Sequence, residues 1–174
     1  MTSADATSAE PIINITGNLI TLGPASRDLL ATYTRWINDF TALRTLGTPA
    51  LGPTSIESET TWYDTTATDS KRPLFTIREK ATGRPIGNCG LNHINDRNRS
   101  AIFGIMIGEH DARGKGFGTE AAHLMLDYSF TALGLHSVSL TVSEYNLAGQ
   151  RAYIKAGFKE SGRWRENQWF GGRY

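Results

Sequence analysis

Residues 113–118 read Arg-Gly-Lys-Gly-Phe-Gly and follow a short apolar run that is rich in β-branched residues. Glycines at 114, 116 and 118 leave backbone N–H groups uncovered. Thr119 opens an amphipathic segment, so these groups point at whatever sits over the start of the predicted helix. The dipole of that helix adds roughly half a positive charge, and Arg113 and Lys115 add two more charges. The spacing therefore predicts an anion site suited to a diphosphate.

Three phosphate-binding loops share this glycine-rich character. A Walker loop requires Gly-Lys followed directly by Ser or Thr, and it is excluded because Gly116 follows Lys115. Residues 116–121 match the dinucleotide pattern GxGxxA, but that pattern belongs early in a doubly wound domain. This loop instead begins the last third of the 174-residue chain. The third spacing is R-x-x-G-x-G, formed by Arg113, Gly116 and Gly118.

With that spacing the chain resembles the GNAT acetyltransferase superfamily, whose signature Q/R-x-x-G-x-G/A binds the pyrophosphate of acetyl-CoA. It is most similar to the branch that contains ribosomal-protein N-terminal and spermidine acetyltransferases. The resemblance runs from about Phe75 to Gly172 and includes further motifs in the same order, at residues 87–91, 118–121, 133–136, 146–153 and 155–158. Several motifs in the right order are more specific than any one of them.

The resemblance implies an α+β GNAT fold, in which a twisted, mostly antiparallel sheet is splayed between its fourth and fifth strands and flanked by helices. The pantetheine arm of acetyl-CoA lies in the splay, which assigns backbone pairing to Ile105, Met106 and Ile107. The amide near Ile107 would polarise the acetyl carbonyl. An ordinary core strand is the alternative. The remaining cofactor contacts are assigned to Arg113, Gly114, Lys115, Gly116, Phe117, Gly118 and Thr119.

Tyr153 lies seven residues after Asn146, which matches a spacing seen in the family. On a helix these positions are two turns apart and share a face, so both can reach one ligand. Tyr153 would donate its proton to the departing thiolate, because both groups have ordinary pKa values of about 9–10. Asn146 would hydrogen-bond the pantetheine. A core tyrosine and a helix N-cap are the alternatives, and Asn146 can do both jobs.

The general base is open. Many relatives carry Glu in the fourth strand, in A-E-I-G, whereas residues 101–104 read Ala-Ile-Phe-Gly. Candidates are His93, Glu109, Glu144 and a chain of water molecules. Cys89 lies in a predicted strand without a charged activator, so we expect it to be structural. It is the single cysteine, which excludes a cysteine-cluster metal site, and no metal is implied.

Helical periodicity predicts a helix over residues 26–40 capped by Ser26, a loop over 43–52, and a second helix over 55–68 with Thr54 and Glu57 as a capping box. By the resemblance, these helices form a wall of the acceptor site. Strands are predicted over 73–79, 85–94 and up to the glycine loop, joined as an antiparallel meander. Residues 12–22 suit a bent strand or a hairpin around Gly17 and Asn18.

After the loop the pattern predicts a helix from Thr119 to Gly134, a strand over 137–142, a helix over 146–156 and a hairpin from Phe158 through Gly172. Chains of the family continue past the position of Tyr174 with a final strand. The resemblance therefore implies that the last strand is missing from this chain or is supplied by a partner. Residues 1–10 are expected to form a flexible tail, and residues 11–174 a single domain.

Composition narrows the function. The net charge of +1 gives no basic field for nucleic acid, and no stretch suits a membrane span or a secretion signal, so a cytoplasmic location is expected. The prediction is an acetyl-CoA-dependent N-acetyltransferase in which a primary amine attacks directly within a ternary complex. Protein N-termini, polyamines, amino acids and amine-bearing antibiotics all remain as acceptors. The rivals are a non-catalytic acyl-CoA sensor or partner-binding domain on the same fold and a dinucleotide oxidoreductase, and a homodimer is compatible with the sequence.

Overall fold

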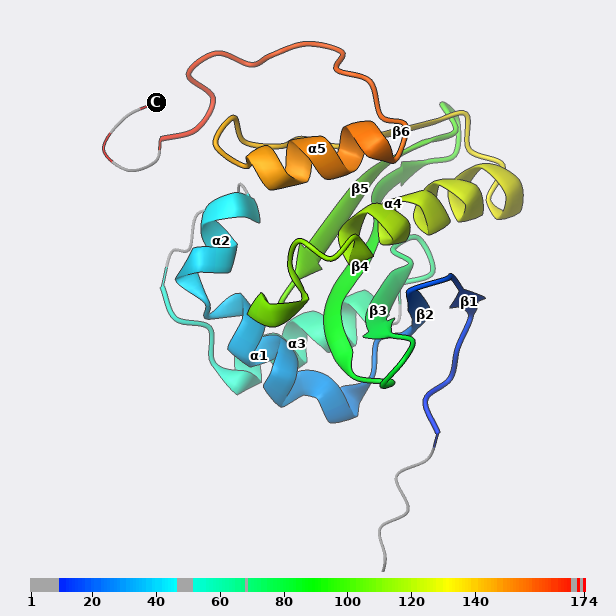
Figure 1. Ribbon diagram of the computed structural model, residues 1–174, viewed down its shortest axis with the longest axis vertical. Helices are drawn as coiled ribbons and strands as arrows, with labels where there is room; N and C mark the ends of the chain where they lie inside the picture. Colours follow the sequence, from blue (N-terminus) through cyan, green and yellow to red (C-terminus); the bar gives the residue numbers. More distant parts are fainter. Residues whose placement is uncertain (1–9, 47–51, 68, 170–171, 173) are drawn as a thin grey trace, which may run out of the picture.

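The structure is a computed structural model that describes residues 10–46, 52–67, 69–169, 172 and 174. Within these ranges one curved sheet of six strands, ordered β1 to β6, carries helices on both of its faces (Figure 1). None of the helices in the described ranges is long and apolar enough to cross a membrane.

The strands are β1 (Ile15–Thr16), β2 (Ile20–Pro24), β3 (Leu74–Glu79), β4 (Pro85–Asn95), β5 (Ser100–Ile107) and β6 (Ser137–Ser139). Neighbours from β1 to β5 are antiparallel, whereas β6 returns parallel to β5. The predicted meander and the hairpin around Gly17 and Asn18 are confirmed. The strand predicted over 137–142 is wrong beyond Ser139, because pairing with β5 stops there.

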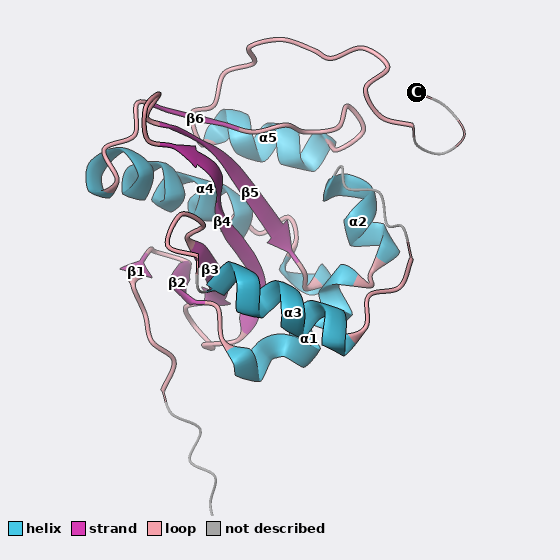
Figure 2. Ribbon diagram, turned by 180° about the vertical axis from the view of Figure 1, so that it is seen from behind, coloured by secondary structure: helices cyan, strands magenta, loops and turns pink. Residues whose placement is uncertain are grey.

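Helices cover the two faces of the sheet. Figure 2 shows α1 (Leu30–Ile37) and α3 (Ile56–Ala67) in front of the sheet and α4 (Phe117–Asp127) behind it. α2 (Phe40–Leu46) contacts β5, and α5 (Leu147–Lys155) packs beside α4. Short 3-10 turns, η1 (Arg27–Leu29) and η2 (His110–Ala112), precede α1 and the glycine loop, and a π-helical turn, η3 (Tyr128–Ala132), extends α4.

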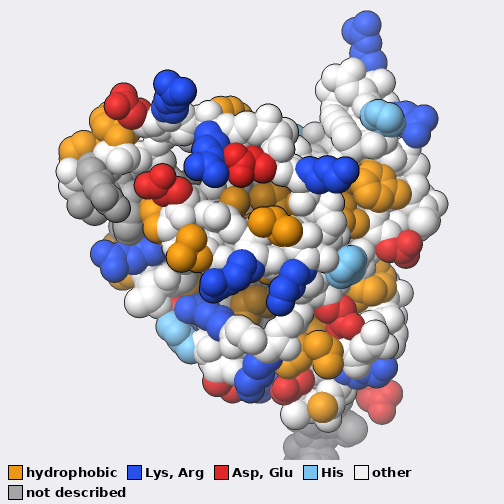
Figure 3. Space-filling model, turned by 45° about the horizontal axis from the view of Figure 1, so that its top comes forward, with side chains coloured by type: hydrophobic (Ala, Val, Ile, Leu, Met, Phe, Trp, Pro, Cys, Tyr) orange, Lys and Arg blue, Asp and Glu red, His pale blue; other side chains and the backbone are white. Residues whose placement is uncertain are grey.

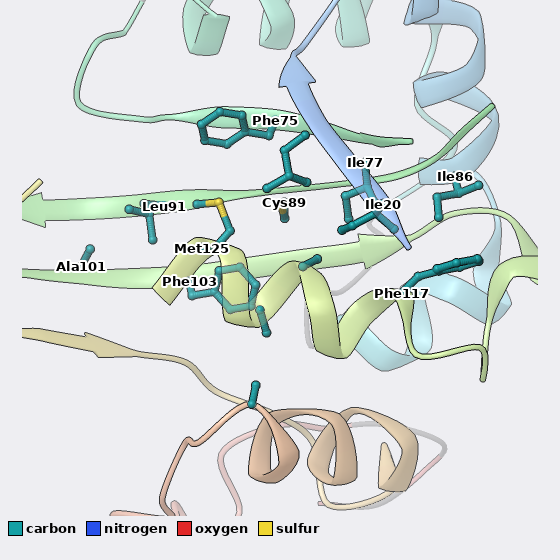
Figure 4. Close-up of a cluster of buried hydrophobic side chains, with 14 of the residues drawn as sticks. Ile20, Phe75, Ile77, Ile86, Cys89, Leu91, Ala101, Phe103, Phe117 and Met125 are labelled. Carbon is teal, nitrogen blue, oxygen red and sulfur yellow. The ribbon is translucent and has the colours of Figure 1, made fainter. Parts of the chain in front are cut away.

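The larger hydrophobic core lies between the sheet and α4 (Figure 4). α4 buries Phe117, Ala121 and Met125 at helical spacing against alternate residues of the strands, whose side chains point to this face. Cys89 is buried in this core, and burial raises the pKa of its thiol, so the thiol stays protonated. The structural role predicted for Cys89 is confirmed.

A smaller cluster lies under α1 on the opposite face. Leu30, Tyr33 and Trp36 are its buried members, and Met106 of β5 and Tyr63 of α3 pack against it. The Tyr33 hydroxyl shares a buried hydrogen bond of 2.6 Å with the Thr76 hydroxyl of β3. α1 is therefore fixed to the sheet by one polar contact as well as by packing.

The predicted helix over residues 26–40 is confirmed up to Ile37, as η1 and α1, but its last residues are wrong, because α1 ends at Ile37 and α2 begins at Phe40. The Asn38 side chain bonds to both the N–H and the carbonyl of Thr54, and the Asp39 carboxylate accepts from Thr41. Such short polar side chains bond their local backbone better at helix ends than inside helices. α2 also occupies residues 43–46 of the predicted loop, and residues 47–51 lie outside the described ranges.

Two predicted caps are also wrong. Ser26 makes no side-chain cap bond, and its N–H donates to the Tyr33 hydroxyl instead. The start of α3 is capped by the Ser55 hydroxyl, which accepts from the Ser58 N–H at 3.2 Å. The capping residue is therefore one position later than the Thr54 that the pattern indicated.

The end of the chain departs most from the prediction. α4 begins two residues earlier than expected, and Gly134 has the positive φ of 63° expected at a helix end. The predicted hairpin from Phe158 is wrong in the described part of this segment. It forms no strand there, because it makes no backbone pairing with the sheet, and it runs beyond α5 (Figure 1).

Candidate active site

The glycine loop has a backbone that side chains other than glycine rarely adopt. Gly114 has φ of 76°, and Gly116, the N-cap of α4, has φ of 88°. In this left-handed region a Cβ atom clashes with the backbone, and a β-branched residue is strained most. Glycine is therefore required where the loop turns into α4.

The start of α4 presents unsatisfied donors. No side chain caps the helix, and the N–H groups of Gly116, Phe117, Gly118 and Thr119 bond to no other described residue. An α-helix leaves its first N–H groups without internal acceptors, and its dipole makes this end positive. A phosphate fits this arrangement through backbone donors alone.

The two cations of the loop differ in position. Lys115 is exposed and forms no hydrogen bond or ion pair with another described residue. The Arg113 guanidinium is turned inward, where Nε donates to the Ile107 carbonyl at 3.0 Å and NH2 to the Gly108 carbonyl at 3.3 Å. Arg113 therefore braces the end of β5 from within the protein, which its place in the motif did not predict.

Glu120 fixes the neighbouring hairpin against α4. Its carboxylate accepts from the N–H groups of Asn18, Leu19 and Ile20 at 2.8, 2.8 and 2.9 Å. A groove of about 810 Å³ lies beside this contact, lined by the first turns of α4, the β1–β2 turn, Lys80 and Lys155. Sequence reasoning missed Glu120, because its partners lie about a hundred residues away.

β5 and β6 separate next to the loop. They pair from Ser100–Ser137 to Ile102–Ser139, and in the described ranges no strand pairs with β5 on this side beyond Ile102. Ile105 and Ile107 pack toward the α4 core and Met106 toward the α1 cluster. The backbone edge of residues 103–107 is open to an extended ligand that runs to the glycine loop.

Tyr153 lies on α5 above this open edge. Its ring packs edge-on against Phe103 and Phe158, at 6.4 and 6.0 Å between centroids. The hydroxyl has no hydrogen-bond partner among the described residues. Burial raises the pKa of Tyr153, so the phenol keeps its proton at neutral pH and has it available to donate.

Asn146 is the N-cap of α5. Its Oδ1 accepts from the Gly149 N–H at 2.9 Å, and its Nδ2 donates to the Thr45 carbonyl of α2 at 3.2 Å. A Cβ at Gly149 would lie 2.7 Å from Nδ2, so glycine is needed beside the cap. The alternative of an N-cap is confirmed, and the same residue ties α5 to α2.

The three side chains weighed as general bases are placed poorly for that role. Glu109 accepts bonds from Arg35 and from the Trp36 indole, and Arg35 lowers the pKa of this carboxyl. Glu144 is exposed. His93 is exposed at the irregular end of β4, next to the register pair Asn92–Ile102. Ile102 lies roughly 17 Å along β5 from Ile107, so His93 is remote from the position assigned to the acetyl carbonyl.

The sheet face toward α1 and α3 is polar and partly open. A Cβ at Gly104 would meet only the Asn92 amide, at 3.7 Å, and Ile102 on the same face is 41% exposed. Met106 closes this face at the α1 end. Part of the sheet beside the open edge of β5 is therefore accessible to a second molecule.

No three His, Cys, Asp or Glu side chains within the described ranges are grouped to hold a metal ion. On the face that carries α5, basic and acidic side chains are mixed with hydrophobic ones (Figure 3). This view contains no broad field of one sign.

Fold and site together define a class of protein. Residues 19–159 match the family described as the acetyltransferase (GNAT) domain, so the chain belongs to the GNAT family. The sheet, with its separated β5 and β6 and its flanking helices, is the GNAT fold.

Particular relatives are spermidine N(1)-acetyltransferases. The protein from Vibrio cholerae serotype O1 is 39% identical over 107 residues, which cover 61% of this chain and 60% of that protein. The protein from Escherichia coli K12 is 33% identical over 112 residues, covering 64% and 59%. The chain thus spans about 60% of the length of these curated relatives.

The match to a solved structure is longer. The Vibrio cholerae spermidine N-acetyltransferase in complex with CoA and spermine covers 91% of both chains, with 28% identity and a TM-score of 0.82. The similarity of fold therefore extends well beyond the segment in which the sequences align most closely.

Proposed function

We propose that this chain is an acetyl-CoA-dependent N-acetyltransferase that acts on a polyamine. The observation that carries the proposal is the set of four unbonded N–H groups at Gly116–Thr119, next to a strand whose outer edge is open. The start of a helix can bind a phosphate group, and an open strand edge can bind an extended chain with amide groups. CoA contains both a diphosphate and such an amide chain.

The cofactor contacts follow from this placement. The diphosphate takes the N–H groups from Gly116 to Thr119, with Lys115 beside them. The pantetheine arm runs along Ile105, Met106 and Ile107. The nucleotide end extends into the groove lined by Lys80 and Lys155, whose charge suits its phosphate.

The polyamine acceptor is inferred from the relatives, whose names specify spermidine and whose structure contains spermine. It would approach along the polar, open face of β4 and β5, past Asn92 and Gly104, with its reacting amine toward Ile107. A long flexible amine suits a strand face that is partly exposed.

In the reaction, the neutral amine nitrogen forms a bond to the thioester carbon and the carbon–sulfur bond breaks. The sulfur leaves as a thiolate and takes the Tyr153 phenolic proton. The new amide loses one proton to water, and the phenol is reprotonated from solvent. Water is assigned as the base because Glu109 is held by Arg35 and Trp36, and Glu144 and His93 are remote or exposed.

The test is release of the CoA thiol from acetyl-CoA, with spermidine, spermine, a simple monoamine and a short peptide as acceptors. We expect release with the polyamines and far less with the others. Binding of acetyl-CoA by titration calorimetry without thiol release for any amine would instead identify the non-catalytic acyl-CoA sensor.

A cytoplasmic site of action and a homodimer remain further expectations of this proposal. Sedimentation at several protein concentrations tests the dimer, and a single species with the mass of one chain at every concentration would exclude it.

A further inference from the structure

Asp39 joins two parts of the molecule that are far apart in sequence. It stands between α1 and α2, on the side where the acceptor wall was predicted. Its carboxylate also reaches Arg113, the first residue of the glycine loop, 74 residues further on. Figure 1 shows the connection between β5 and α4 beside the α1–α2 junction.

The two oxygens of Asp39 serve different partners. Oδ1 accepts from the N–H and hydroxyl of Thr41, at 2.9 and 2.6 Å, and so starts α2. Oδ2 lies 2.7 Å from His110 Nε2 and accepts from Arg113 NH2 at 3.4 Å. The hydrogen bonds from Thr41 lower the pKa of Asp39 to about 2, so the carboxylate is ionised at any physiological pH.

His110 extends the contact to Arg113. Its Nδ1 lies 3.2 Å from Arg113 NH1, which can only donate, so Nδ1 must accept. The proton of a neutral ring is then on Nε2, where it donates to Asp39. One tautomer thus satisfies all three side chains, and the order of bonding is Asp39, His110, Arg113 and the carbonyls of Ile107 and Gly108.

This network explains why Arg113 faces inward. A guanidinium at the start of a phosphate-binding loop would otherwise turn to the anion or to water, and the side chains of Asp39 and Arg113 remain only 21% and 33% exposed. A partly buried guanidinium with a fixed carboxylate keeps its donors on the β5 carbonyls. The end of β5 and the first residues of the loop are then fixed relative to α1 and α2.

We propose, on the basis of the proposed function, that Asp39 is a positioning residue that holds Arg113 against β5 and so pre-forms the acetyl-CoA loop from the acceptor side. Asp39 touches neither substrate, and its effect passes through Arg113. Because the loop is held in its binding geometry before the cofactor arrives, binding does not have to order it.

Asp39→Asn separates the two functions of the side chain. The amide oxygen can still accept from Thr41, whereas the amide nitrogen places a donor against the donors of His110 and Arg113. We expect the KM and the dissociation constant for acetyl-CoA to rise about tenfold, with kcat at saturation changed less than twofold. Calorimetry and initial rates with spermidine measure these quantities.

Thr41→Val is the matched control. It removes the hydroxyl bond to Oδ1 and leaves Oδ2 and its partners intact, so it alters α2 but keeps the acetyl-CoA constants at wild-type values. His110→Ala removes an exposed ring and with it only the indirect link from Asp39 to Arg113. The dissociation constant for acetyl-CoA should then rise by less than in Asp39→Asn. This variant keeps the test decisive if Asp39→Asn folds poorly.

Arg113→Lys completes a double-mutant cycle. If Asp39 acts through Arg113, the double variant binds acetyl-CoA no more weakly than Arg113→Lys alone. Additive losses, or an unchanged constant in Asp39→Asn, would overturn the inference while leaving the enzyme assignment intact. Failure of the wild-type protein to bind acetyl-CoA would remove the proposed function, and this inference with it.

Discussion

The two faces of the sheet present different chemical groups to a ligand. On the α4 face, backbone groups at the start of the helix and along β5 are left free above a large apolar core. On the α1 face, a small aromatic cluster and polar strand residues leave part of the sheet uncovered. The α4 face therefore offers backbone groups to a ligand, and the α1 face offers side chains.

A fold built in this way can keep one cofactor while its acceptor changes. A ligand bound by backbone N–H groups depends on φ angles, and the positive values at residues 114 and 116 are ones that glycine adopts readily. A ligand bound by side chains depends on what α1, α2 and α3 present. Substitutions in the glycine loop should therefore change cofactor binding directly, whereas substitutions on the α1 side should reach it only through the contact of Asp39 with Arg113.

The largest effect is expected for Gly116→Val. A β-branched residue at φ of 88° is strained, and its side chain would cover the donors at the start of α4. We expect acetyl-CoA affinity to fall by a factor on the order of 100 or more, measured by calorimetry. Gly83→Val is the control, because Gly83 has φ of 70° in the remote β3–β4 turn. An equal loss in both variants would mean that instability, not the loop, is responsible.

Tyr153→Phe comes next and tests chemistry rather than binding. Loss of the phenolic proton should lower kcat about 100-fold while the dissociation constant for acetyl-CoA stays the same. Because burial raises the pKa of Tyr153, wild-type activity should not decline from phenol ionisation below about pH 10. Tyr128→Phe, at another half-buried tyrosine that packs on Phe75, is the control. A normal kcat in Tyr153→Phe would contradict the assigned role.

On the α1 face, Gly108→Ala should mainly destabilise the protein. A Cβ there would lie 2.2 Å from the Trp36 indole, a ring held by its bond to Glu109. Overpacking of this kind costs about 2 kcal/mol, or roughly 4–8 °C in the unfolding midpoint. Gly104 lies four residues earlier, within β5, and has free space above it, so the midpoint of Gly104→Ala should stay level or rise slightly. Equal midpoints would show that Trp36 yields without cost.

The sequence could predict those features that depend on residues close together in the chain. The glycine loop, the start of α4 and the Asn146 cap depend on residues within a few positions of one another, so their spacing was informative. The meander was predictable because its strands follow one another through short turns. Family motifs gave the order of the elements but could not say which way a side chain turns.

The features that the sequence did not predict depend on contacts between residues far apart in the chain. Arg113 turns inward because Asp39 lies beside it in space, and Glu120 bonds to a hairpin about a hundred residues earlier. The break after Ile37 depends on Asn38 meeting Thr54. Helical periodicity continues across that break, so only the folded arrangement reveals two helices and the corner that carries Asp39.

The smallest expected effect concerns two carboxyls on the α1 side whose pKa values move in opposite directions. Glu59 of α3 is 7% exposed, and burial raises its pKa above the ordinary value of 4.5. The unfolded chain then ionises first, so this residue lowers the free energy of unfolding as pH rises through 4.5. Glu59→Gln should therefore stabilise the protein at pH 7, and the gain should vanish near pH 4.

Glu109 provides the opposite sign in the same region. Arg35 lowers its pKa, so its contribution is stabilising above 4.5 and is lost as pH falls through the lowered folded value. Glu109→Gln should destabilise the protein at pH 7. Urea unfolding of both variants at pH 7 and pH 4 measures the two differences. A destabilised Glu59→Gln at pH 7 would mean that the Glu59 carboxylate is charged and paired inside the folded protein, which would contradict the raised pKa.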